Sequence, residues 1–177
     1  CVATYQGDLA PALICLGAVV HLASSAGRRD MPLEQFFQED GITRNVLKNG
    51  EIVTHVELPE SSSTMFGSYQ KLRQREAWDF PEGGVAFAVQ VDDGGKISGL
   101  NMASTGFESI PRSHKDLVDS IDIGAEWGLE AKRLGAELKR TVRPVLNTWF
   151  PPSYRKKMAS VLAKRAMEEA ANRATSA

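Results

Sequence analysis

The order of strand-like and helix-like segments constrains the fold of this 177-residue chain more than any other feature. Three segments predict β-strands: residues 66–75, 85–91 and 97–104. The glycine-rich residues 92–95 between the last two suit the turn of an antiparallel hairpin. Beyond Pro111 the apolar spacing becomes helical, and three segments predict helices: residues 113–121, 123–140 and roughly 154–173. Because each apolar face needs a covering layer, we predict an α+β fold with a three-stranded antiparallel sheet packed against a helical bundle.

The last predicted helix is amphipathic. Tyr154, Met158 and Leu162 fall on one of its faces, which predicts that this face packs on the sheet. Arg155 and Lys156 lie elsewhere around the helix, and we expect them to be outside the apolar contact.

The N-terminal part predicts a short helix and a smaller β-structure. Asp8 can cap a helix over residues 9–16, which Gly17 ends. Residues 18–23 are apolar and β-branched, and residues 24–28 resemble a turn; Pro32 opens a helical turn that runs to Phe37. Residues 51–58 alternate like a strand with two distinct faces. The serine-rich residues 59–64 predict a domain boundary, which divides the chain into residues 1–60 and 61–177.

Composition narrows the class of protein. With 42% hydrophobic residues the chain can bury a core, and 21 basic against 22 acidic residues give a net charge of −1. This balance argues against nucleic acid or an anionic membrane as the partner. The longest apolar run, residues 9–20, is too short to span a membrane and lacks the features of a secretory signal, so we expect a cytoplasmic protein. Cys15 is expected to be a small core residue on a helix.

Two motifs carry a resemblance to a known family. They are Gly-Asp-Leu-Ala-Pro-Ala-Leu at residues 7–13 and Tyr-Gln-Lys-Leu-Arg-Gln-Arg-Glu-Ala-Trp-Asp-Phe-Pro at residues 69–81, with Gly-Glu-Ile-Val at residues 50–53 between them. In this order and spacing they resemble the FAD-binding medium subunit of molybdenum hydroxylases, the family of xanthine dehydrogenase, carbon monoxide dehydrogenase and 4-hydroxybenzoyl-CoA reductase. The resemblance covers residues 1 to about 167.

This resemblance implies the end of an α/β FAD-binding domain over residues 1–60, followed by a domain like the CO dehydrogenase flavoprotein C-terminal domain over residues 61–177. The two glycine-rich turns with which the family binds the FAD pyrophosphate do not occur in this sequence. The chain is therefore similar to the C-terminal half of the family subunit. Its first residue is Cys1 rather than Met, so we expect the numbering to start inside a longer polypeptide or at a processed end.

The resemblance implies five FAD contacts: Asp8, Val53, Lys71, Asp79 and Phe80. A lysine cation near the ring could favour the negatively charged reduced flavin or anchor an oxygen. Each residue also has an ordinary structural interpretation that stays open. Asp8 would only cap a helix, Val53 would be a strand core residue, and Lys71 would be a solvated strand lysine.

Other residues of the second motif have two interpretations as well. The charged residues Arg73, Arg75 and Glu76 either bind an anion or form a solvated strand face with weak ion pairs. Trp78 either stacks on a ring or packs in the core at a strand end.

Cysteine and histidine are the residue types in this chain whose metal-binding role needs to be weighed. The 4-hydroxybenzoyl-CoA reductase branch of the family carries an extra iron–sulfur cluster, and Cys1 lies about where its last cysteine ligand would be; a 4Fe–4S cluster would need three further ligands upstream. Alternatively, Cys1 is simply a residue at a domain seam. His21, His55 and His114 lie far apart in the sequence and show no i, i+4 metal-binding pattern.

The function implied by the resemblance is electron transfer. The chain would belong to an FAD-dependent oxidoreductase subunit that passes electrons between iron–sulfur clusters and FAD or an external acceptor. Its partners would be a molybdopterin-binding large subunit, where substrate chemistry occurs, a 2Fe–2S small subunit and an N-terminal FAD-binding segment. A flavin-free scaffold or subunit-interaction module derived from the same fold is the alternative. A binding protein for a small ligand is a third, which depends on Trp78 with Arg73 and Arg75.

Overall fold

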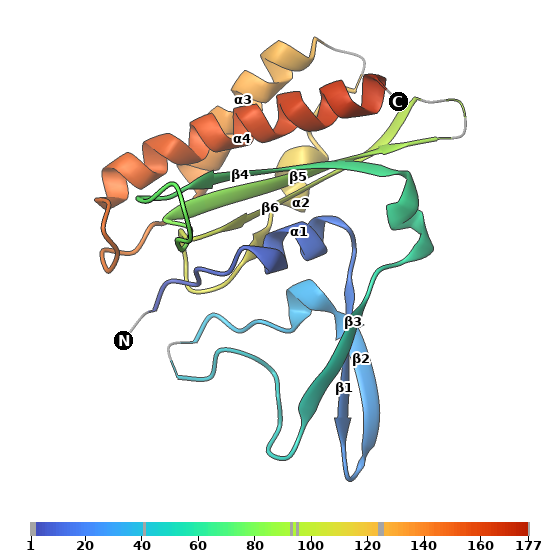
Figure 1. Cartoon of the computed structure of the whole chain (residues 1–177). Helices are drawn as coiled ribbons and strands as arrows, with labels where there is room; N and C mark the ends of the chain where they lie inside the picture. The colour runs from blue at the N-terminus through green and yellow to red at the C-terminus, as the bar shows by residue number, and fades with distance from the viewer. Residues whose placement is uncertain (1–2, 41, 93, 95, 124–125, 177) are drawn as a thin grey trace.

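The computed structural model describes residues 3–40, 42–92, 94, 96–123 and 126–176. The larger of its two sheets is antiparallel, with strand order β4-β5-β6-β7. Its strands are β4 (Met65–Leu72), β5 (Gly83–Val91), β6 (Ile97–Thr105) and the two-residue β7 (Arg112–Ser113). Helices α3 (Trp127–Thr141) and α4 (Pro152–Thr175) cover one face, and α1 (Leu9–Cys15) lies on the other (Figure 1).

Strand β5 shows why this sheet is covered on both faces. Val85, Phe87 and Val89 belong to the core shared with α3 and α4. The alternate residues Ala86 and Ala88 belong to the core shared with α1. Successive side chains of a strand point to opposite faces, so the large residues fill the space under the long helices and the alanines admit α1 closely.

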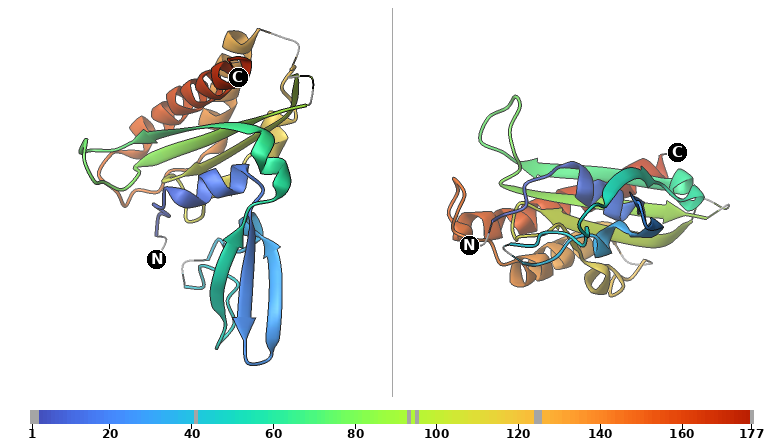
Figure 2. Two further views of the ribbon diagram at one scale, coloured as in Figure 1. Left: turned by 45° about the vertical axis from the view of Figure 1, so that its right-hand side comes forward. Right: turned by 90° about the horizontal axis from the view of Figure 1, so that it is seen from below.

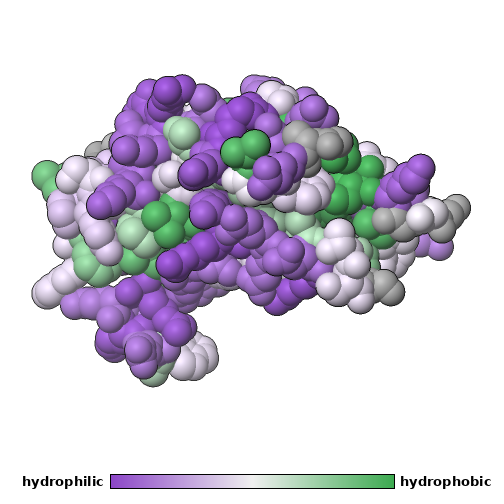
Figure 3. Space-filling model, turned by 90° about the horizontal axis from the view of Figure 1, so that it is seen from above, coloured by the Kyte–Doolittle hydropathy of each residue, from purple (hydrophilic) through white to green (hydrophobic). Residues whose placement is uncertain are grey.

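Helix α4 approaches its neighbours through small side chains. Ala159, Ala163 and Ala166 are fully buried on it. On α3, Gly135 faces the backbone of Ser160 so closely that an added Cβ would lie 2.5 Å from the Ser160 carbonyl oxygen. The two helices therefore pack almost backbone to backbone. Seen from the α3 and α4 side, the molecular surface is mostly hydrophilic, with scattered apolar positions (Figure 3).

The smaller sheet has the antiparallel order β2-β1-β3 and extends away from the larger one (Figure 2). It consists of β1 (Val19–Ser24), β2 (Gly27–Pro32) and β3 (Ile52–Glu57). Val20 and Leu22 of β1 are buried beside Leu33 of the 3-10 helix η1 (Leu33–Gln35). A second 3-10 helix, η2 (Glu60–Thr64), connects β3 to β4.

The predicted α+β architecture is confirmed, with corrections in its elements. The predicted three-stranded sheet has the short β7 as a fourth strand, and β2 was not predicted. The predicted helix over residues 113–121 reduces to α2 (Lys115–Val118). Parts of two other predictions, Asp93 and Gly95 in the hairpin turn and residues 124–125 in the helix, lie outside the described residues.

Three predictions about single elements are wrong. Asp8 does not cap α1, because its own backbone is helical and its carboxylate makes no capping hydrogen bond. Strand β3 does not bury one face, since all six of its residues are exposed at this edge of the small sheet. Arg155 is not outside the packed region but completely buried, because it donates hydrogen bonds to carbonyl groups beneath α4.

Among the residues that the structure describes, no helix combines the length and apolarity that crossing a bilayer requires.

Candidate functional site

The carboxylate of Asp8 links the start of α1 to β4. Tyr69 and Lys71 are two residues apart on β4 and therefore point to the same face, the one on which α1 lies. The Tyr69 hydroxyl donates to Asp8 Oδ1 at 2.7 Å, and the Lys71 ammonium donates to Asp8 Oδ2 at 2.7 Å. Burial, followed by the hydrogen bond to Asp8, raises the pKa of the Tyr69 hydroxyl. Tyr69 thus keeps its proton and holds the Asp8 carboxylate in place.

The Lys71 ammonium is held from a second side. Its Nζ also donates to the backbone carbonyl of Asp79 at 2.5 Å. These two contacts use two of the three N–H donors of an ammonium group. The Lys71 side chain is 19% exposed, so its remaining donor can reach a ligand oxygen at the surface of the cluster.

The Asp79 carboxylate shapes the loop between β4 and β5. It accepts hydrogen bonds from the backbone N–H groups of Gln74 (3.1 Å), Arg75 (2.8 Å) and Phe80 (3.0 Å). It also pairs with the Arg75 guanidinium at 3.2 Å. The backbone N–H and the guanidinium of Arg75 lower the pKa of Asp79 to about 2. This carboxylate is therefore occupied within its loop, and the Asp79 backbone, not its side chain, contacts Lys71.

A surface cavity of about 440 Å³ opens beside this cluster. Its wall includes Asp8, Lys71 and Asp79 together with Arg73 and Trp78. The Trp78 side chain is 96% exposed, so the core interpretation of Trp78 is wrong. Phe80 follows Asp79 directly and is 69% exposed. The cavity combines a held cation, a held carboxylate and exposed aromatic surface.

The structure thus brings together some of the predicted FAD contacts and not others. Asp8, Lys71 and Asp79 share one cavity wall, and Phe80 adjoins it in sequence. Val53 lies on β3 of the smaller sheet and does not line this cavity. Cys1 lies outside the described residues.

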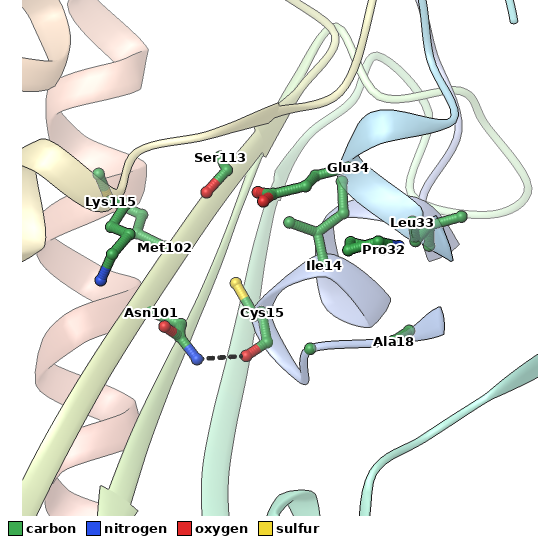
Figure 4. Close-up of a pocket in the computed structure, with 11 residues that line it drawn as sticks. Ile14, Cys15, Ala18, Pro32, Leu33, Glu34, Asn101, Met102, Ser113 and Lys115 are labelled. Atoms are coloured by element: carbon green, nitrogen blue, oxygen red, sulfur yellow. Dashed lines mark hydrogen bonds between the residues drawn. The ribbon is translucent and has the colours of Figure 1, made fainter. Parts of the chain in front are cut away.

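A second cavity, of about 190 Å³, lies between α1, η1 and β6 (Figure 4). Within it the Asn101 amide donates to the backbone carbonyl of Cys15 at 2.7 Å. The Cys15 thiol is buried, donates to the Ala86 carbonyl at 3.4 Å, and has its pKa raised by burial. Cys15 is thus a core residue on a helix, as predicted, and its protonated thiol is a poor nucleophile.

Sequence reasoning missed one cluster of chemically capable residues. His21 and His55 lie far apart in the sequence and show no metal-binding spacing, but the pairing of β1 with β3 places them opposite each other. The signal that finds this pair is the strand register, which follows from pairing β1 with a strand more than 30 residues away. No local spacing in the sequence carries that information.

Comparisons with known proteins give consistent matches. Residues 1–61 match the family described as the FAD binding domain in molybdopterin dehydrogenase, and residues 67–170 match the CO dehydrogenase flavoprotein C-terminal domain. The nicotinate dehydrogenase FAD-subunit of Eubacterium barkeri is 30% identical over 125 residues, which cover 70% of this chain and 42% of that protein. The carbon monoxide dehydrogenase medium chain of Afipia carboxidovorans is 26% identical over 170 residues, covering 95% of this chain and 57% of that protein.

Solved structures share the fold. A reconstituted CO dehydrogenase from Oligotropha carboxidovorans superposes with a TM-score of 0.81 at 23% identity, over 94% of this chain and 57% of that chain. Quinoline 2-oxidoreductase from Pseudomonas putida 86 superposes with a TM-score of 0.79 at 20% identity, over 97% of this chain and 58% of that chain. This chain spans about half the length of the curated relatives it matches.

Proposed function

This chain belongs to the family of FAD-binding medium subunits of molybdenum hydroxylases, and we propose that it forms one wall of an FAD site in an electron-transfer subunit. The subunit would pass electrons between iron–sulfur clusters and FAD, and on to an external acceptor. The observation that carries the proposal is the Lys71 ammonium, fixed between the Asp8 carboxylate and the Asp79 carbonyl at the edge of an open cavity.

The residues at this cavity fit a flavin. Lys71 offers a positive charge and a free N–H donor to a ligand oxygen, and Trp78 and Phe80 offer apolar ring surfaces. Asp8, itself held by Tyr69, orients Lys71. When bound, FAD supplies the redox chemistry, and the protein supplies binding, orientation and electrostatics. Asp8, Lys71, Phe80 and the backbone of Asp79 would contact it, and Val53 would contact a part of the cofactor that lies nearer the smaller sheet.

The same family membership supports a proposal for the assembly. The relatives are FAD-binding or medium subunits of enzymes that are named for three different substrates: nicotinate, carbon monoxide and aldehydes. This supports the proposal that the subunit does not select the substrate. We therefore place substrate chemistry on a molybdopterin-binding large subunit and the 2Fe–2S clusters on a small subunit. Residues 1–60 would close the FAD-binding domain begun by an N-terminal segment, and residues 61–177 would form the second domain. The match of residues 1–61 to an FAD-binding family speaks against the flavin-free scaffold.

Replacing Lys71 tests the site. In the native assembly, Lys71→Ala should lower the FAD content per chain or make the flavin midpoint potential more negative, because a cation that stabilises the reduced flavin is gone. Lys71→Arg keeps the positive charge, so it should retain most of the FAD content and most of the midpoint potential of the unmodified protein. The matched control is Lys157→Ala, an exposed lysine on α4.

The outcomes separate two claims. If Lys71→Ala retains the FAD content and potential of Lys157→Ala, the assignment of Lys71 is wrong while the family role stands. Absence of FAD from the unmodified assembly would contradict the cofactor role itself. Thermal melting of each variant distinguishes loss of the site from loss of the fold.

A further inference from the structure

Two imidazole rings stack on the surface of the smaller sheet. His21 of β1 and His55 of β3 are direct cross-strand partners, and a β-bulge follows at His21/Leu22. Their ring centroids are 4.2 Å apart and the rings are inclined by only 4°. Side chains of directly paired residues lie on the same face of an antiparallel pair, so both rings occupy the face opposite the buried Val20 and Leu22.

A carboxylate completes the group. Glu57 is two residues beyond His55 on β3 and shares its face. Glu57 Oε2 lies 2.9 Å from His21 Nε2. One potential ligand atom from each of His21, His55 and Glu57 lies within 4.8 Å of the other two. Zinc–nitrogen bonds of about 2.0–2.1 Å place two ligating nitrogens up to ~4.2 Å apart and lie in the plane of each ring, so binding one ion requires the two rings to tilt out of their parallel stack.

The Thr54 hydroxyl fixes the proton on His55. It donates its only hydrogen to the backbone carbonyl of His21 at 3.1 Å. At its 3.0 Å contact with His55 Nδ1 it must therefore accept, which places the proton of the neutral ring on Nδ1. The lone pair is then left on Nε2. Outer partners of this kind orient metal-binding histidines and set their tautomer.

Charged residues of both signs surround the group. Asp30 of β2 is the cross-strand partner of His21 on the side away from His55, so Asp30, His21 and His55 form a row across three strands. Arg28 lies two residues before Asp30 on β2 and lines the same pocket as His21 and His55, whereas Arg29 pairs with Glu51 at 2.7 Å. Two carboxylates therefore flank the imidazoles on this face.

We propose that His21, His55 and Glu57 bind one divalent first-row transition-metal ion, best served by Zn²⁺. Two imidazole nitrogens and one carboxylate oxygen suit zinc, whereas calcium and magnesium prefer all-oxygen sites. The side chains of His21 and Glu57 are 28% and 63% exposed, so the fourth position is open to water or to a side chain of another subunit. This site is separate from the Lys71 cavity and does not depend on the proposed electron-transfer function.

The test measures zinc in the full native assembly. After equilibration with buffered Zn²⁺ and removal of excess metal, zinc per chain is determined by elemental mass spectrometry, with molybdenum and iron in the same samples reporting an intact complex. We expect one zinc ion per chain, lost in His55→Ala and strongly reduced in Glu57→Gln. Glu60→Gln, an exposed carboxylate a few residues away, should bind like the unmodified protein.

Thr54→Val supplies a second test. It leaves all three ligands in place but removes the hydroxyl that fixes the tautomer, so zinc affinity should fall by about 10–100-fold. Cobalt(II) should give the visible absorption of a low-symmetry, histidine-ligated ion in the unmodified protein and not in His55→Ala. Zinc content equal in the unmodified protein and His55→Ala would overturn the proposal and leave a stacked imidazole pair that has only a structural role.

Discussion

The guanidinium of Arg155 connects the start of α4 to the ends of the sheet beneath it. It donates to the backbone carbonyls of Glu82 and Val145, each at 2.7 Å, and to that of Gly106. Burial lowers the pKa of Arg155, which the nearby Glu82 carboxylate opposes. The bonds to Glu82 and Gly106 are buried, so these two carbonyls depend on this one side chain for a hydrogen bond.

Removing this guanidinium should be costly. We expect Arg155→Met to lower the free energy of unfolding by about 3–5 kcal/mol, because it leaves buried carbonyl acceptors without donors and removes the cation 3.9 Å from the Glu82 carboxylate. Urea denaturation measures the change, and Lys157→Met on the exposed side of α4 is the control. Equal stability of the two variants would mean that the buried contacts of Arg155 do not hold the fold.

His114 should make stability depend on pH. Burial, followed by repulsion from Arg112, lowers the pKa of His114 from 6.5 to about 4. The unfolded chain binds the proton first as pH falls, so the stabilising contribution is complete above about pH 6.5 and is lost progressively down to pH 4, by about 3 kcal/mol in total.

The measurement is unfolding free energy at pH 7 and pH 5, a range above the main titration of carboxylates. The unmodified protein should lose stability over this interval, and His114→Gln should lose much less. Parallel pH profiles for the two proteins would contradict the assignment to His114.

At the scale of elements, the α3–α4 contact depends on one glycine. An added Cβ at Gly135 would lie 2.5 Å from the Ser160 carbonyl oxygen and 3.0 Å from its hydroxyl. Gly135→Ala should therefore force the helices apart and cost about 1–3 kcal/mol. Gly128→Ala on the same helix meets only Glu126 Oε1 at 3.5 Å, so it should be neutral or stabilising by up to ~1 kcal/mol. Thermal unfolding of both variants checks the prediction, and a neutral Gly135→Ala would refute the close crossing.

Sequence patterns predicted the elements that have a strong period and missed those that do not. β4, β5, β6, α3 and α4 were found near their observed bounds. β2 contains Gly27, Asp30 and Pro32, residue types that are uncommon in strands, and it forms by pairing with β1. Local pattern also could not reveal that Arg155 would be buried, since its partners are backbone carbonyls from distant segments.

The candidate sites show the same limit. The motifs predicted Asp8 and Lys71 as flavin contacts, and the structure places their side chains 2.7 Å apart. The role of the Asp79 backbone as an acceptor for Lys71 depends on loop geometry that spacing does not encode. The His21–His55–Glu57 group depends on strand register with a bulge, which is likewise invisible in a one-dimensional pattern.

At the scale of the whole molecule, two surface features stand out: the charged cavity beside Lys71 and the exposed edge strand β3. β3 is an edge strand whose Ile52, Val53 and Val56 are 64%, 43% and 38% exposed. We propose that this exposed edge, which carries Val53, contributes to the proposed FAD site. The Lys71 cavity and Val53 would then contact different parts of one extended cofactor.

The most direct test is the amount of FAD released when the natively purified assembly is denatured, expressed per copy of this chain. The account predicts one FAD per chain, because membership in the family of FAD-binding medium subunits and the Lys71 cavity both point to a bound flavin. An intact assembly that releases no flavin would contradict it, and would mean that the fold serves subunit contacts alone.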